Sequence, residues 1–398
     1  MNADPIALLK GELRPPRYIV NLDLPPRQRY HEIAKAYKEK FHSLTPLFED
    51  VLSEVPYHKL VAFIARHLLR RVYYSEEQEE IKGIVEVTGM PLYLMIAFNT
   101  FLDTFMGCTS GAVKLERDPN GLDGLDEDRD KMVHFRTLDW GMDELRSLII
   151  QIDYQRGGET VAQSITYAGF VGVLTGVRKD LSLSLNFRPA ADEGTSQLTV
   201  GFHKLMVVLG LRPSIAAQLR EFLIPSKNKE PQTLAEIVET FPGSASAPCY
   251  ITLCDGKRAF FIEKDVHHAG IDTSEEFITG TNHDARMDGW KSEDYFTYAK
   301  TLAKNENATI AAGISEELLE DSQVRKNCIR LLYTGAQNAM RVRRSTRRKT
   351  DGGIGLGTVV SWCQTYPISN ECTHFSCIMD PKEGEISWLK YHIQPIER

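Results

Sequence analysis

The first hundred residues carry their apolar side chains mainly at helical spacing, after one short extended segment. Tyr18 to Leu24 alternates apolar and polar residues, which is typical of a strand, and the pair Pro25-Pro26 ends it. Apolar positions then recur every three or four residues, which predicts helices over 28–51, 57–74, 76–87 and 91–104. The N-terminal part of the chain is therefore expected to be mainly helical.

The pattern changes to strands after residue 108. Runs rich in β-branched and aromatic residues, bounded by Gly, Asp or Asn, predict strands over Val133–Leu138, Leu148–Tyr154, Val161–Ile165, Leu181–Phe187, Cys249–Leu253, Arg258–Glu263, Phe277–Thr281, Thr358–Thr365, His374–Met379 and Ile386–His392. Helical spacing predicts helices over 198–209, 213–223, 232–240, 290–304 and 315–340. Pro381–Gly384 is typical of a hairpin turn. A long antiparallel set with interspersed helices indicates the α+β class.

Composition narrows the class of protein. The chain has 398 residues, 42% of them hydrophobic and 25% charged, which is ordinary for a globular protein. A net charge of −7 argues against nucleic acid as a partner. No apolar run approaches the roughly 20 residues of a membrane span. The first residues lack a basic region followed by an apolar stretch, so we expect either a cytoplasmic protein or an incomplete start of the chain.

All seven cysteines lie at or after position 108, and their odd number leaves at least one free thiol. Cys249 and Cys254, like Cys372 and Cys377, are pairs with four residues between them. Each pair is either two buried small residues or a local disulfide. No second Cys/His pair completes a tetrahedral set, so neither a metal site nor a cofactor is expected. Because residues 1–107 hold no cysteine, no disulfide can join them to the rest of the chain.

Two segments stand out by charge. Residues 115–130 form an acidic, Gly-rich loop between two expected strands. Residues 341–349 read Arg-Val-Arg-Arg-Ser-Thr-Arg-Arg-Lys. This basic run is either a solvated loop or a contact for anionic lipid, since clustered Lys and Arg are attracted to negative membrane surfaces.

The candidate chemistry centres on Cys108 in the stretch Phe-Met-Gly-Cys-Thr-Ser-Gly. A strand-like segment that contains Arg136 and Asp139 follows it. This combination suits an N-terminal-nucleophile amidase, in which the chain cuts itself before the Cys and the freed α-amine activates the thiol. That amine has a reference pKa of about 7.7–8.0. Taken alone, Cys108 is better explained as a buried core cysteine, and the spacing of Arg136 and Asp139 alone favours a surface ion pair.

An ordered series of segments resembles the family of acid ceramidase and N-acylethanolamine-hydrolysing acid amidase, in the choloylglycine-hydrolase-like branch of the Ntn hydrolases. The series spans most of the chain and comprises 15–26, 80–84, 91–92, 98–99, 108–110, 136–139, 167–172, 174–176 and 281–284. The resemblance implies an αββα sandwich of antiparallel sheets. It also implies self-cleavage of the Gly107–Cys108 bond, which would leave a mainly helical N-terminal segment, 1–107, and a catalytic domain, 108–398, as two subunits held non-covalently.

The resemblance also assigns site residues. Asp139 would hold the α-ammonium, and Arg136 would favour the thiolate and guide the acyl carbonyl. Asn282, in Thr-Asn-His-Asp, matches a family Asn that donates its amide to the oxyanion, although this tetrapeptide also suits a plain turn. Arg325 fits the family's distal active-site Arg loosely. His283 would be the base of a papain-like scheme, but no cysteine-protease signature surrounds Cys108.

For function, the resemblance implies an amidohydrolase of N-acyl lipids, with ceramide as the first substrate and N-acylethanolamine as the alternative. The alternative outside the enzymes is a catalytically silent lipid-binding homologue. The family's known members imply a lysosomal or vacuolar compartment. An apolar substrate groove is expected near Tyr167–Gly172, unless this segment is a plain strand connection. The apolar and basic stretch 57–74 is expected to be either a helix that contacts anionic membrane or a buried helix.

Overall fold

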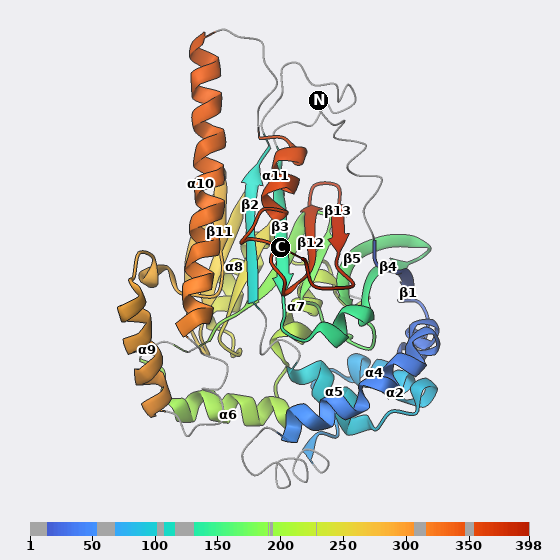
Figure 1. Ribbon diagram of the computed structural model, residues 1–398. Coiled ribbons are helices and arrows are strands. Elements are labelled where there is room, and N and C mark those ends of the chain that lie inside the picture. Colours follow the sequence, from blue (N-terminus) through green and yellow to red (C-terminus); the bar gives the residue numbers. More distant parts are fainter. Residues whose placement is uncertain are drawn as a thin grey trace.

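The structure is a computed structural model that describes residues 14–53, 68–101, 107–115, 131–189, 191, 194–227, 229–305, 316–346 and 354–397. Two β-sheets pack face to face, and helices cover their outer faces (Figure 1). The mainly helical N-terminal part lies at one end of this sandwich.

Within the described residues, the larger sheet has eight strands in the order β1-β4-β5-β6-β7-β8-β9-β10. Neighbouring strands are antiparallel, except that β1 pairs with β4 in parallel. The parallel pair differs from the purely antiparallel sheets that were expected, and it inserts the N-terminal strand into the edge of the main sandwich. The strand bounds are β1 Arg17–Asn21, β4 Ile149–Arg156, β5 Glu159–Tyr167, β6 Thr175–Arg178, β7 Leu181–Phe187, β8 Cys249–Cys254, β9 Ala259–Lys264 and β10 Ala269–Ser274.

In the described part of the chain, the smaller sheet has five antiparallel strands in the order β11-β2-β3-β12-β13. Its strands are β11 Phe277–Gly280, β2 Gly107–Lys114, β3 Met132–Asp139, β12 Thr373–Asp380 and β13 Glu385–Tyr391. The register of β2 on β3 places Gly107 opposite Asp139 and Cys108 opposite Leu138. The strand β3 is buried along its whole length, because one of its faces meets the larger sheet and the other meets helices.

Helices form the two outer layers. On the smaller sheet, α10 (Glu316–Thr346) packs on β2 and β11, α11 (Leu356–Cys363) packs on β3 and β12, and α9 (Ser292–Asn305) lies along α10. On the larger sheet, α7 (Ile215–Leu223) packs on β6 and β7. The remaining helices are α2 His31–Ser53, α4 Ser75–Thr88, α5 Leu92–Phe101, α6 Gln197–Val208 and α8 Leu234–Thr240, with short 3-10 turns at Pro26–Gln28, Asp143–Leu148, Phe241–Gly243 and Ala285–Met287. This order of layers confirms the predicted αββα sandwich with its helical N-terminal segment.

The strand expected over Thr358–Thr365 is wrong, because this segment forms the helix α11. The β-branched run of Thr358, Val359 and Val360 favours a strand when it is taken alone. The buried side chains of the helix are Val359, Val360, Trp362 and Cys363, which lie on one helical face toward β3 and β12. Packing on the sheet therefore overrides local propensity here.

Other differences concern two strands and the two charged segments. The strands β6 and β10 were not expected from the sequence. The helix α10 continues to Thr346, so residues 341–346 of the basic run are helical rather than a loop, and 347–349 lie outside the described residues. The acidic segment lies outside them from 116 to 130.

The stretch 57–74 is described only from Leu68 onward. The chain from Leu69 to Tyr74 is not helical, in contrast to the expected helix. Leu69 is buried in the main hydrophobic core, together with apolar side chains of α4 and α5. The end of this stretch therefore anchors the N-terminal helices to the sandwich.

Candidate functional site

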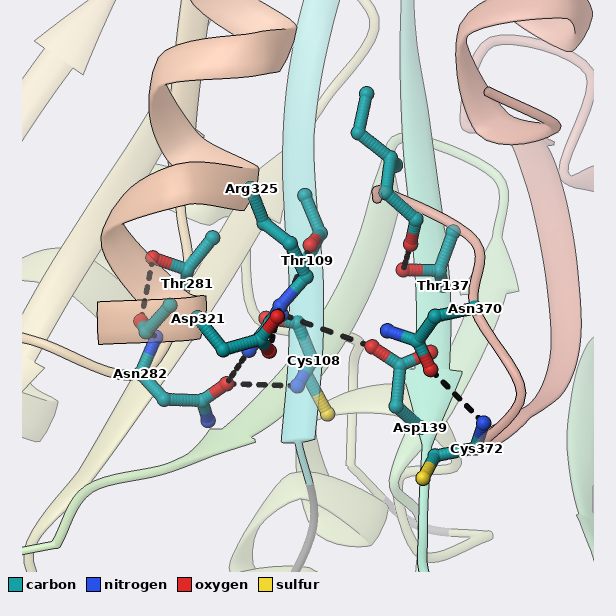
Figure 2. Close-up of polar contacts among 12 residues, drawn as sticks. Cys108, Thr109, Thr137, Asp139, Thr281, Asn282, Asp321, Arg325, Asn370 and Cys372 are labelled. Atoms are coloured by element: carbon teal, nitrogen blue, oxygen red, sulfur yellow. Dashed lines mark hydrogen bonds and ion pairs between the residues drawn. The ribbon is translucent and has the colours of Figure 1, made fainter. Parts of the chain in front are cut away.

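Cys108 is the second residue of β2 (Figure 2), and its side chain points toward Leu185 on β7 of the larger sheet. The residue is fully buried, and its Sγ lies 3.8 Å from the carbonyl oxygen of Leu185. Burial raises the pKa of the thiol, while the charge of Arg136 lowers it. A cysteine in this position is either a core residue or a nucleophile, and the groups that surround it decide between the two.

Arg136 reaches Cys108 from the neighbouring strand β3. Its Nη2 donates to Cys108 Sγ at 3.2 Å, a geometry that favours the thiolate. Its Nη1 donates to the carbonyl oxygen of Leu185 at 2.6 Å and to Asn186 Oδ1 at 3.2 Å. Asn186, which sequence reasoning missed, thus orients the guanidinium from β7. No local motif marks Asn186, since its role follows from the packing of one sheet on the other.

Asn282 lies just after β11 and faces the main chain of Cys108. Its Oδ1 accepts from Cys108 N at 2.7 Å and from Arg325 Nη2 at 3.1 Å, and its Nδ2 donates to the carbonyl oxygen of Phe187 at 2.8 Å. These partners fix the orientation of the amide, because the oxygen meets two donors and the nitrogen meets an acceptor. Asn282 therefore contacts the main chain of Cys108, and its amide oxygen is the atom that faces Cys108.

Arg325 enters the site from α10 (Figure 2). Its Nη1 donates to the carbonyl oxygen of Cys108 at 2.6 Å and to Thr109 Oγ1 at 3.0 Å. Its Nε donates to Asp321 Oδ2 at 2.9 Å, one helical turn earlier. The structure thus brings together Cys108 and a residue that the sequence matched only loosely.

Asp139 ends β3, beside Gly107 on β2. Its Oδ1 accepts from Thr373 Oγ1 at 2.6 Å, and its Oδ2 lies 3.6 Å from Arg325 Nη1. Burial raises the pKa of this carboxyl to about 6, against the lowering effect of Arg325. Arg136 and Asp139 are both buried, and an odd separation along β3 points them to opposite faces, so they are not a surface ion pair.

His283 does not act on the thiol in this arrangement. Its Nδ1 is 2.8 Å from Ser322 Oγ and its Nε2 is 2.9 Å from Asp288 Oδ1. Both ring nitrogens are thus occupied by partners other than Cys108. The papain-like scheme therefore has no support in the geometry.

The segment Tyr167–Gly172 is a buried connection between β5 and β6. Asn99 on α5 holds it, since its Nδ2 donates to the carbonyl oxygen of Gly169 and its Oδ1 accepts from Val171 N. Gly169 has a φ of 84°, and a Cβ there would lie 2.7 Å from Phe41. The segment is therefore a packed strand connection, and the apolar groove beside it stays a prediction.

None of the seven cysteines takes part in a disulfide in the structure, so neither spaced pair forms a local disulfide. Among the residues that the structure describes, no cluster of three or more His, Cys, Asp or Glu side chains is arranged to hold a metal ion. Across the same residues, no helix has the length and apolar character that crossing a bilayer requires.

Comparison with known proteins supports the resemblance. A family model described as the beta subunit of N-acylethanolamine-hydrolyzing acid amidase matches residues 14–73. Acid ceramidase of Mus musculus is 32% identical over 200 residues, which is 45% of this chain and 47% of that protein. Acid ceramidase of Homo sapiens is 31% identical over 200 residues, with the same coverage. The chain thus matches about half the length of these curated relatives.

A solved structure, the Caenorhabditis elegans N-acylethanolamine-hydrolyzing acid amidase (NAAA) ortholog, overlaps with a TM-score of 0.44 at 19% identity. The overlap covers 69% of this chain and 93% of that one. The resemblance rests on the sequence matches. They confirm the resemblance to the family of acid ceramidase and N-acylethanolamine-hydrolysing acid amidase over the parts of the chain that they cover.

Proposed function

We propose that this protein is an N-terminal-nucleophile amidase that hydrolyses the amide bond of N-acyl lipids, with ceramide as the first substrate. One observation carries the proposal: three groups distant in sequence meet three different atoms of Cys108. Arg136 contacts its Sγ, Asn282 its nitrogen and Arg325 its carbonyl oxygen. A core cysteine needs none of these contacts. A nucleophile that is also a chain terminus needs its sulfur, its nitrogen and its carbonyl oxygen all held in position.

Self-cleavage would generate the active form. Cys108 Sγ would attack the carbonyl carbon of Gly107, and the thiol proton would pass to the peptide nitrogen of Cys108, which would leave that carbon as an amine while a thioester forms. Water would then hydrolyse the thioester, which ends the first piece at Gly107 and frees the α-amine of Cys108. Arg136 beside the sulfur would stabilise the thiolate that starts this sequence.

The same atoms would then hydrolyse the lipid amide. The α-amine of Cys108 would take the thiol proton, and the thiolate would attack the acyl carbonyl carbon. The tetrahedral intermediate would collapse to an acyl thioester as the α-ammonium protonates the leaving amine, and water would release the fatty acid. Asn282 would hold the α-amine through the contact that Oδ1 already makes with Cys108 N, or would donate its amide to the oxyanion as the family resemblance implies. Asp139, beside Gly107 at the strand end, would hold the α-ammonium.

Several contacts would keep the two cleaved pieces together without a disulfide. The strand β1 pairs with β4 at the edge of the larger sheet, so the first piece contributes a strand to a sheet of the second piece. Glu80 on α4 accepts from both Nη atoms of Arg220 on α7, and both residues are buried. Breaking a buried ion pair of this kind leaves an uncompensated charge, which strongly opposes separation.

We further propose that the enzyme reaches its substrate at an anionic membrane surface through α6. Leu198, Phe202 and Leu205 lie on one face of this helix and are 85%, 54% and 47% exposed. Arg71, itself exposed next to Arg70, donates to the carbonyl oxygen of Leu209 at the end of α6. An exposed apolar stripe beside basic residues is typical of a surface that lies on anionic lipid. This proposal moves the contact away from Leu69, which belongs to the core.

The proposal is tested by incubating the purified protein with ceramide or an N-acylethanolamine in detergent micelles and measuring fatty acid release. We expect release by the wild type, two pieces that meet at the Gly107–Cys108 bond by mass spectrometry, and an inactive single chain for Cys108→Ala. The ratio of kcat/KM for the two lipids decides between the two substrates. An active but uncleaved wild type would overturn the mechanism, and an inactive wild type that binds the lipids would favour a silent lipid-binding homologue.

A further inference from the structure

A row of buried side chains ties the turn that carries Asn282 to the helix α10. The main-chain nitrogen of Asn282 donates to Ser322 Oγ at 2.7 Å. Ser322 precedes Arg325 by three positions on α10, so both lie on the same face of the helix. One turn of α10 thus holds Asn282 twice, by its main chain through Ser322 and by its side chain through Arg325.

The row continues away from Cys108. Ser322 Oγ also contacts Thr281 Oγ1 at 2.9 Å and His283 Nδ1 at 2.8 Å, and His283 Nε2 contacts Asp288 Oδ1 at 2.9 Å. Asp288 in turn accepts from Lys326 Nζ at 2.9 Å, again on α10. Ser322, Thr281 and His283 are fully buried. The turn from Thr281 to Asp288 is therefore bound to α10 at both of its ends.

The contacts that run from Ser322 through His283 to Asp288 resemble a hydrolase triad. The hydroxyl of Ser322, however, cannot serve as a nucleophile here. Ser322 is fully buried, and its oxygen already accepts the N–H of Asn282. A nucleophile must instead reach the carbonyl carbon of a bound substrate. The row therefore supports the neighbouring Cys108 site rather than forming a second one.

We propose that Ser322 is a positioning residue for Asn282. With its hydroxyl held by His283, it fixes the main chain of Asn282, and that fixes where the amide oxygen meets Cys108 N. Placement of this kind matters because productive geometry tolerates errors of only about 0.5 Å. This inference rests on the proposed function, since it gives Ser322 a role only if Asn282 acts at Cys108.

The test is a double-mutant cycle of Ser322→Ala and Asn282→Ala, with initial rates of N-acyl lipid hydrolysis by the matured protein. We expect Ser322→Ala to lower kcat by roughly fivefold to twentyfold with little change in KM, the loss that one buried hydrogen bond corresponds to. In the Asn282→Ala background we expect no further fall, because a residue that acts through another is not additive with it. Equal falls in both backgrounds, or no fall in the wild-type background, would overturn the role.

Two further variants keep the test decisive. Ser164→Ala removes a buried hydroxyl that donates to the carbonyl oxygen of Thr175 at 2.8 Å, and it is expected to leave kcat unchanged. Ser322→Cys keeps the side-chain volume but offers only a weak acceptor, so it replaces Ser322→Ala in the cycle, with the same two outcomes, if the alanine variant does not fold. An inactive wild type, or an active Cys108→Ala, would instead overturn the proposed function and this role with it.

Discussion

The guanidinium of Arg325 donates to the carbonyl oxygen of Cys108 at 2.6 Å, although 217 positions separate the two residues along the chain. The same side chain donates to Asn282 Oδ1 and lies 3.6 Å from Asp139 Oδ2. Arg325 thus connects the start of β2 with the other polar groups of the site. The planar guanidinium can donate to several partners at once, and a lysine ammonium cannot reproduce this geometry.

We therefore predict that Arg325→Lys and Arg325→Gln each lower kcat by roughly 10- to 100-fold, the range for loss of charged hydrogen bonds. Steady-state kinetics on the matured protein measures the effect, and mass spectrometry reports whether self-cleavage also slows. Arg341→Gln, at an exposed position of the same helix, is the control and should match the wild type. A near-normal kcat for Arg325→Gln would remove Arg325 from the site.

The orientation of the Asn282 amide yields a second prediction. Asn282→Ala should lower kcat by roughly 10²–10³, the usual loss for one donor to an oxyanion, and a comparable acceptor for the α-amine would give a similar loss. Asn282→Asp separates the two roles, because it keeps an acceptor toward Cys108 N but removes the donor. We expect Asn282→Asp to retain more activity than Asn282→Ala, since the oxygen is the atom that faces Cys108. Equal losses in both variants would favour the oxyanion role.

The buried carboxyl of Glu77 predicts a dependence of stability on pH. Burial raises its pKa to about 7, while Arg220 lowers it and the carboxylates of Glu80, Glu221 and Glu76 raise it further. Since the folded pKa exceeds the ordinary value of about 4.3, the folded state binds more protons between these values. Glu77 therefore contributes most favourably to the unfolding free energy below about pH 4.3, and this contribution is lost as the pH rises toward about 7.

Glu77→Gln should remove that contribution. We expect the unfolding free energy of this variant, minus that of the parent, to increase by on the order of 1–3 kcal/mol from pH 5 to pH 7.5. Urea unfolding in the Cys108→Ala background measures this on an uncut chain. Other titrating groups cancel in the difference between the two proteins. Glu239→Gln, at an exposed position of α8, should show no such change. A Glu77→Gln curve parallel to that of the parent would mean that Glu77 does not titrate in this range.

The exposed face of α6 predicts how the protein binds vesicles. Leu198→Glu combined with Phe202→Glu should abolish binding to vesicles rich in anionic lipid while sparing hydrolysis of a water-soluble short-chain amide. Added salt should weaken the wild-type binding, because it screens the basic residues beside the helix. Ile271→Glu with Ile393→Glu, two exposed apolar positions elsewhere, is the control that should still bind. Retained binding by the α6 variant, measured by co-sedimentation, would contradict this docking surface.

The sequence by itself determined which segments have the residue spacing of strands or helices, the helical N-terminal part and the candidate nucleophile. Leu181–Phe187 was predicted with its observed bounds, because its regular alternation and flanking turn residues are local signals. Cys108, Arg136 and Asp139 were found because they lie in short motifs. The spacing of these residues did not show which partner each would meet, since that depends on how the two sheets pack.

Only the tertiary structure decided the rest. It turned residues 356–363 into a helix, because one face could be buried against β3 and β12. It placed Asn186 beside Arg136 and Ser322 behind Asn282, contacts between residues that are 50 and 40 positions apart. It also buried Leu69 in the core and left the apolar face of α6 exposed. Burial and long-range contacts depend on the packing of whole elements, and local sequence patterns carry no information about which elements will meet.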